Sequence, residues 1–208
     1  MDPTGIERWR ATCARLGLRN VDSEHRKLLR AWKSWGRHYH SRMHLEACLR
    51  HFSSAHFLAT EPAEVELALW FHDAIYRTWR RDNELRSSVW ARMFVVTHGG
   101  RHDIAARVSS HVMATAHVER KLSSDAALVV DIDLSILGQP QAVYDEFERN
   151  VRREYWWVPK RRYSAARTAV LKSFLNRPTI YHLPMFRDRL EQPARENLQR
   201  ALKALVAQ

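Results

Sequence analysis

The sequence contains little cysteine: among its 208 residues, only Cys13 and Cys48 are of this type. Two thiols are too few for a disulfide framework. Cys48 also falls in a helical pattern, where cysteine serves as a small hydrophobe. We therefore expect a protein of a reducing compartment, the cytoplasm.

The sequence also lacks a long apolar run. No stretch approaches the roughly 18 apolar residues that are needed to cross a bilayer. The amino terminus, Met1 to Gly5, shows no charged lead followed by an apolar core. We expect neither secretion nor insertion into a membrane. The hydrophobic share of 45% is ordinary for a globular protein.

Acidic residues are the minority among the charged ones. The chain has 23 Asp and Glu against 34 Lys and Arg, a formal net charge of +11. Such an excess attracts anionic partners over long range, although it can equally give a well-solvated exterior. The partner classes that it favours are a phosphorylated small molecule or nucleotide, a nucleic acid and an acidic surface.

Strand signals are missing as well. We find no alternating strand pair with a hairpin turn, no internal repeat and no low-complexity linker. Apolar residues recur instead at helical spacing along most of the chain. The sequence predicts an all-α fold of about eight helices in one domain, with a core over residues 32–138 and carboxyl-terminal helices over residues 139–208 packed on it.

Several polar residues interrupt the helices that look most buried. His72 and Asp73 lie within an apolar helix that is expected to start near Thr60 and to continue through Ala74 and Ile75, and burying them unpaired would cost several kcal/mol. His40 and His44 lie four positions apart, on one face of another expected helix. Because imidazole and carboxylate bind divalent ions, a shared metal would remove the cost. The alternative is that the histidines bond to backbone and the carboxylates pair with arginines.

The order of these residues resembles a known signature. His44, the pair His72 and Asp73, and then Asp133 follow the H…HD…D pattern of the HD superfamily of metal-dependent phosphohydrolases. More narrowly, the chain resembles the small bacterial branch of predicted HD phosphohydrolases, from about Trp32 to the carboxyl end. The segments that carry this resemblance are 37–40, 70–76, 82–88, 131–138, 153–155 and 194–198.

The resemblance implies a metal centre and a proton donor. It implies that His44, His72, Asp73 and Asp133 bind one or two divalent ions (Mn, Mg, Ni, Co or Fe). The segment from Tyr39 to His44 is also similar to that of cyclic-nucleotide phosphodiesterases, which implies that His40 is the general acid. The remaining aspartate of the downstream segment, Asp131, is an alternative or supporting ligand.

Further residues are candidates for the chemistry around the ion. Glu84 lies in an Asp-Asn-Glu motif that the branch shares and is a catalytic candidate. His117 resembles a family position that binds phosphate or a second metal. Many HD hydrolases continue His-Asp with Ile-Gly-Lys, whereas this chain has Ala-Ile-Tyr. The cations that can balance substrate charge are Arg37, Arg80 and Arg81.

The function that the resemblance implies is hydrolysis of a phosphomonoester or nucleotide-like phosphoester by attack of metal-bound water. One alternative is an HD-fold oxygenase with two irons, in which His111 and His117 would be additional ligands. Another is a non-catalytic nucleotide- or nucleic-acid-binding module with a vestigial metal site. Its motivation is the net charge and the basic, aromatic stretch 152–163, whose aromatic residues can equally anchor a helix to the core.

Overall fold

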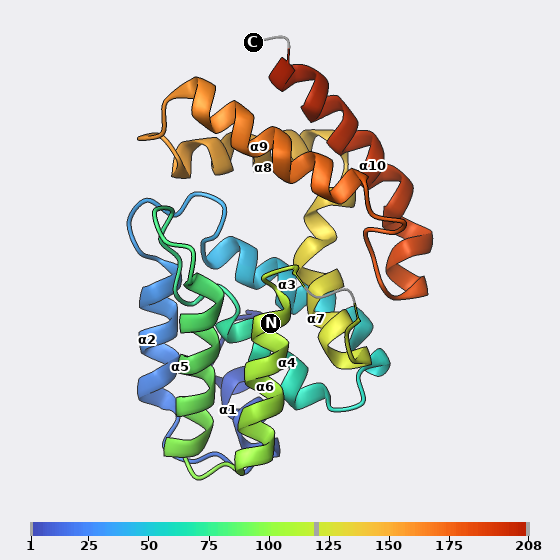
Figure 1. Ribbon diagram of the computed structural model, residues 1–208. Helices are drawn as coiled ribbons and strands as arrows, with labels where there is room; N and C mark the ends of the chain where they lie inside the picture. Colours follow the sequence, from blue (N-terminus) through green and yellow to red (C-terminus); the bar gives the residue numbers. More distant parts are fainter. Residues whose placement is uncertain (1, 119–120, 207–208) are drawn as a thin grey trace. The chain divides into compact units, whose positions relative to one another are not determined.

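The computed structural model describes residues 2–118 and 121–206. Within these ranges the chain is all-helical, as predicted, with ten α-helices, two 3₁₀ helices and no strand (Figure 1). The prediction of about eight helices was therefore too low. The chain forms two compact units, Met1–Ile132 and Asp133–Gln208, and its organisation as one domain stays a prediction.

The first unit holds seven of the α-helices described. They are α1 (Ile6–Arg15), α2 (Asp22–Trp32), α3 (Arg42–Ala55), α4 (Pro62–Phe71), α5 (Asn83–Thr97), α6 (His102–Ala114) and α7 (Ser124–Asp133), with the 3₁₀ helix η1 (His56–Leu58) after α3. The second unit contains η2 (Leu134–Gly138), α8 (Gln141–Glu154), α9 (Lys160–Leu175) and α10 (Pro184–Val206).

Helix α4 is the core of the first unit. Every residue from Glu64 to Phe71 is buried, and the helix packs against α1, α3, α5 and α6. Its two buried glutamates are neutralised from neighbouring helices: Arg107 of α6 binds both carboxylate oxygens of Glu64, and Arg8 of α1 binds Glu66. Because arginines pair with both of its buried glutamates, α4 can be buried on all sides by neighbouring helices.

The start of α4 is bound by α7. The carboxylate of Asp125 accepts the backbone N–H groups of Thr60 and Glu61 at 2.7 and 2.9 Å. Glu61 precedes the helix and makes no capping bond of its own. A carboxylate at a helix amino terminus also interacts favourably with the helix dipole.

Helices α5 and α6 run side by side and are joined by a turn at two glycines (Figure 1). Gly99 adopts φ +90°, a conformation that only glycine adopts readily. A Cβ atom on Gly100 would lie 2.5 Å from a methyl group of Val95. The pair therefore ends α5, as the sequence predicts, and lets the chain turn close to the core.

In the second unit, α10 packs on η2 and α9 (Figure 1). A Cβ atom on Gly138 would meet the backbone of Leu190 at 2.8 Å, so only glycine permits this approach. Asn197 donates from its side-chain amide to the carbonyls of Leu137 and Gln139, both at 2.8 Å. These contacts fix the carboxyl-terminal helix on the short helix η2.

Several element boundaries differ from those predicted. Helix α3 begins at Arg42, so His40 lies before it and not on its face. Helix α4 ends at Phe71, and the His72–Asp73 pair lies in the turn that follows. In the second unit, α10 begins at Pro184 and continues through Pro193. Pro193 is exposed, which lets water satisfy the carbonyl that it leaves unbonded.

Among the described residues, no single helix combines the length and the apolar composition that crossing a bilayer requires. The segments Ser124–Gly138 and Gln141–Glu154 reach those values only as a bent pair.

Candidate metal centre

His72 is held with one ring nitrogen available as a ligand. The residue is 1% exposed and follows the last residue of α4. Its Nδ1–H donates to the carbonyl of Leu69 at 2.8 Å. In a neutral imidazole the other nitrogen, Nε2, then carries the lone pair. Such a backbone bond is the usual way in which proteins fix the tautomer of a metal-binding histidine.

His44 meets His72 from the first turn of α3. The two Nε2 atoms lie 3.1 Å apart, and both residues are buried. The indole of Trp32 lies beside both rings, with centroids 6.2 and 5.3 Å away, and its Nε1–H donates to the carbonyl of Trp70. The Nε2 atoms of His44 and His72 therefore lie close together, beside the indole ring of Trp32.

Asp73 brings a carboxylate to the same place. Its Oδ2 lies 3.5 Å from Nε2 of His72 and 4.0 Å from Nε2 of His44. The turn after α4 makes this possible, because consecutive side chains within a regular helix point about 100° apart. The carboxylate is 12% exposed, which leaves a path to solvent.

The three separations match a single ion. Metal–nitrogen bonds of about 2.1 Å place two ligand atoms about 3.0 Å apart at a right angle and about 4.2 Å apart when opposite. The observed 3.1, 3.5 and 4.0 Å lie between these limits. His44, His72 and Asp73 thus have the donor types and the spacing for a divalent cation.

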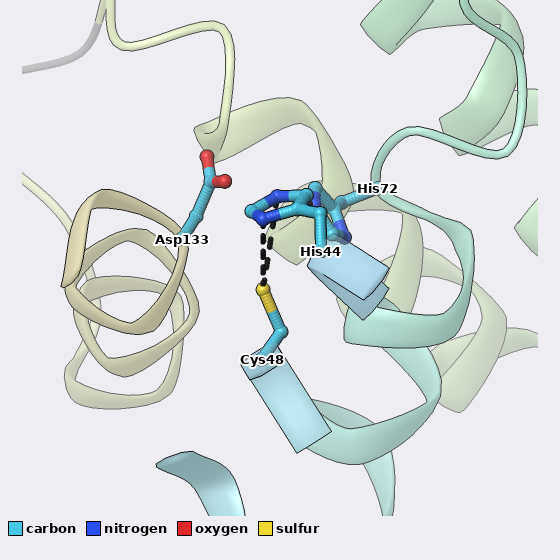
Figure 2. A group of neighbouring side chains, drawn as sticks. All are labelled: His44, Cys48, His72 and Asp133. Atoms are coloured by element: carbon cyan, nitrogen blue, oxygen red, sulfur yellow. Dashed lines mark hydrogen bonds between the residues drawn. The ribbon is translucent and has the colours of Figure 1, made fainter. Parts of the chain in front are cut away.

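Cys48 lies one turn beyond His44 on α3, and the sequence analysis treated it only as a small hydrophobe. His44, Cys48, His72 and Asp133 each offer a ligand atom, and these four atoms lie within 4.8 Å of one another (Figure 2). The group can therefore hold a metal ion. The spacing of a histidine and a cysteine four positions apart was the signal in the sequence, because such residues share a helix face.

The sulfur of Cys48 contacts the ring of His44 rather than one of its lone pairs. It lies 3.8 Å from Nδ1 and 3.7 Å from Nε2 (Figure 2). A thiolate bound to zinc would lie about 2.3 Å from the ion. Because the sulfur is nearly equidistant from both nitrogens, we interpret it as a packing contact with a weak hydrogen bond.

Asp133 is the last residue of α7, and the boundary between the two units falls at the peptide bond before it. Helix α7 therefore determines where Asp133 lies in the group, and α7 is bound to the start of α4 through Asp125. Asp131, the alternative ligand in the sequence analysis, is completely buried on the same helix and is not a member of the group.

Arg37 connects the loop that carries His40 to the turn that carries His72 and Asp73. Its guanidinium donates to the carbonyls of Asp73 at 2.7 Å, Ala74 at 2.9 Å and His40 at 3.1 Å. It also lies over the rings of Trp32 and Tyr76. These contacts make Arg37 a link between the loop before α3 and the turn after α4, and its predicted contact with substrate stays a prediction.

The turn is held from its other side by α5. Asn83 accepts the backbone N–H of Arg77 and donates to its carbonyl, both at 3.0 Å. The hydroxyl of Ser87 accepts the N–H of Ile75 and also lies 3.3 Å from its carbonyl oxygen. The sequence analysis included both residues in the family resemblance but gave them no role.

His40 lies beside the metal centre. Its ring stacks on Tyr76 with centroids 4.1 Å apart and lies 6.0 Å from the ring of His44. Glu84 is half-buried in the first turn of α5. Among the cations, Arg80 is exposed and pairs with Asp82, which raises the pKa of this arginine, and Arg81 is exposed.

The two histidines of the oxygenase alternative lie on or just after α6. His111 is 5% exposed on this helix, and His117 is half-buried after its end with φ +56°. Neither belongs to the group of potential ligands. Burial lowers the pKa of His111, and the carboxylates of Asp125 and Glu64 only partly offset this effect.

Comparisons with protein-family models, with curated proteins and with solved structures find no match for this chain.

Proposed function

We propose that the chain is a metal-dependent phosphohydrolase of the HD superfamily. The observation that carries this proposal is the convergence of His44, His72 and Asp73 at distances that suit one divalent ion. Asp133 lies in an overlapping group with His44, Cys48 and His72, which does not include Asp73. The two imidazoles and the carboxylates of Asp73 and Asp133 together would form a donor set that suits Mn, Fe, Co or Ni and would leave positions open on a six-coordinate ion.

A bound ion would supply Lewis-acid activation of a phosphoryl oxygen and a lowered pKa of a water molecule. The chain would supply the rest. His40, next to the ligands, would give a proton to the leaving oxygen. Arg37 would keep the His40 loop and the turn after α4 in register, and Tyr76 would orient the His40 ring by stacking. The substrate class is a phosphomonoester or nucleotide-like phosphoester, and the site of action is the cytoplasm.

The experiment combines metal content with turnover. Wild-type protein, purified without added metal or chelator, would be compared with Asp73→Ala, Cys48→Ala and the control Asp188→Ala, which removes an exposed carboxylate on α10. Metal would be measured by elemental analysis, and turnover with p-nitrophenyl phosphate and bis-p-nitrophenyl phosphate. We expect Asp73→Ala to lose the ion and at least about 100-fold in turnover, and the other two variants to keep both.

Contrary outcomes are distinct. Turnover retained in Asp73→Ala, with its fold intact by circular dichroism, would refute the proposal. Loss of the ion in Cys48→Ala but not in Asp73→Ala would make the sulfur the ligand and the family ligand set wrong. Two irons per chain with iron-dependent oxygen uptake would favour the oxygenase.

A further inference from the structure

A pocket of about 800 Å³ lies between α8, α9 and the end of α10, all in the second unit. None of its lining residues belongs to the metal centre. One stripe of α8 supplies Arg149 and Arg153, the first turn of α9 supplies Lys160 and Tyr163, and α10 supplies the small residues Ala201 and Ala204. Helix α10 also contributes Arg200 and Leu205, so all three helices bring cations to the pocket, and α10 adds a small apolar surface.

The cations of this pocket differ in whether they are neutralised. Arg200 bonds to Asp145, and Glu148 is bound on both oxygens by the half-buried Arg167. Arg149, Arg153 and Lys160 are exposed and form no ion pair within residues 2–118 and 121–206, although the charge of Arg149 adds to the effect of Arg200 in lowering the pKa of Asp145. Arg149 and Arg153 are also four positions apart on α8, where like charges repel each other. A bound anion would remove this repulsion.

The interior of the pocket is largely apolar. Arg152 lies over the ring of Tyr163 at 4.7 Å and is fixed by bonds to the carbonyls of Tyr155 and Val158. Tyr163 is 8% exposed, and its hydroxyl has no hydrogen-bond partner among the described residues. Burial raises the pKa of Tyr163 to about 12, so the hydroxyl remains a donor at neutral pH.

We propose that this pocket binds a small amphiphilic organic anion, with a phosphate, sulfonate or carboxylate group on an apolar body. Arg149, Arg153 and Lys160 would bind the anionic group, and they stand near the amino terminus of α9, where the helix dipole favours negative charge. The apolar body would lie on Tyr163, Ala201 and Ala204. Inorganic phosphate fits less well, because it makes no use of the apolar part, and binding of a nucleic acid is an outcome that the test below distinguishes.

The test uses the full chain and the fluorescent probe 8-anilinonaphthalene-1-sulfonate, an aromatic sulfonate. The double variant Arg149→Gln/Arg153→Gln removes two lining cations. Its matched control, Arg161→Gln/Arg162→Gln, removes two exposed cations of α9 that do not line the pocket. We expect affinity to fall at least about tenfold in the first variant, because the anionic group loses two charge-assisted hydrogen bonds, and less than about twofold in the control.

A third variant tests the apolar part. Ala204→Trp fills the pocket without a change of charge and should abolish probe binding, with its fold checked by thermal unfolding. Octyl phosphate below its micellar concentration should displace the probe, and inorganic phosphate or a single-stranded oligonucleotide should not. Asp73→Ala should bind the probe like wild type, so failure of the metal proposal would not affect this result.

Two results would overturn the proposal. An equal loss in both arginine double variants would show attraction by net charge alone. Displacement by inorganic phosphate or by the oligonucleotide, with Ala204→Trp unaffected, would show an anion site that makes no use of the apolar interior.

Discussion

At the scale of single residues, the metal centre depends on where protons and lone pairs are fixed. The backbone carbonyl of Leu69 takes the Nδ1 proton of His72 and leaves Nε2 free to bind an ion. The same Nε2 faces that of His44 at 3.1 Å, a distance that two metal ligands adopt naturally. In His72, the hydrogen bond of Nδ1 therefore orients the ring so that Nε2 can act as the ligand atom.

Arg37 has two possible roles that kinetics can separate. In Arg37→Lys the three carbonyl contacts cannot all be kept, because an ammonium lacks the planar fork of a guanidinium. We expect kcat to fall about 10- to 100-fold with KM and metal content unchanged, as for other residues that position metal ligands. The control is Arg26→Lys, an exposed arginine of α2.

Steady-state kinetics with p-nitrophenyl phosphate checks this prediction. A rise in KM with kcat unchanged would show that Arg37 contacts the substrate, which is the role that the sequence analysis gave it.

His111 makes the stability of the protein depend on pH. Burial keeps its pKa below the ordinary value of 6.5, so the unfolded chain binds a proton more readily than the folded one. The free energy of unfolding should therefore fall as the pH drops through 6.5 and below. In His111→Leu this loss between pH 7 and pH 5 should be smaller than in wild type.

Urea unfolding at the two pH values measures the effect of His111→Leu. The exposed His56, replaced by glutamine, serves as the control. An identical pH dependence in wild type and His111→Leu would contradict the assignment.

At the scale of elements, α4 and α7 depend on each other. Asp125 of α7 accepts the N–H groups of Thr60 and Glu61 where α4 begins. The metal-binding turn follows the other end of α4, and Asp133 ends α7. One carboxylate therefore aligns two helices that both supply ligands.

Asp125→Ala tests this alignment. Loss of a capping carboxylate costs about 1–2 kcal/mol in the free energy of unfolding, and we expect a value near the upper end because two N–H groups lose their partner. We also expect weaker metal binding, since both ligand-bearing helices lose an anchor. Ser124→Ala, which removes a neighbouring exposed hydroxyl, should change stability by less than about 0.5 kcal/mol.

Denaturant unfolding and metal titration measure the two effects of Asp125→Ala. A loss of stability with metal affinity unchanged would show that the cap supports the fold but does not position the ligands.

At the scale of the whole molecule, the proposed metal binding would be coupled to folding. The ligands come from α3, from the turn after α4 and from α7, so an ion binds only the folded chain. At a free ion concentration of about 100 times Kd, binding adds about 2.7 kcal/mol to stability. A chain of this size gains roughly 2–4 °C in Tm per kcal/mol.

We therefore expect a chelator to lower the Tm of the metal-loaded protein by about 5–10 °C. Thermal unfolding at fixed protein and ion concentrations measures the shift. The Asp73→Ala variant should show no shift, and a shift of equal size in this variant would place the stabilising ion elsewhere.

Much of the fold could be predicted because helical periodicity is a local property. The all-α class, the buried helix before His72 and the turn at Gly99 follow from such patterns. Boundaries were less predictable: α10 continues through Pro193, which its exposed position permits, and α3 starts only at Arg42. The role of Asp125 could not be predicted, because its partners are 64 and 65 positions away.

The sequence by itself determined the helical class and the residue types that suit a metal, since composition, periodicity and the order of His44, His72 and Asp73 are properties of the chain. Only the tertiary structure decided how these residues meet. It ended α4 at Phe71, brought Oδ2 of Asp73 to 3.5 Å from Nε2 of His72, placed Cys48 beside His44, and turned Arg37 toward backbone carbonyls. The reason is physical: distances between side chains far apart in sequence depend on how helices end and pack.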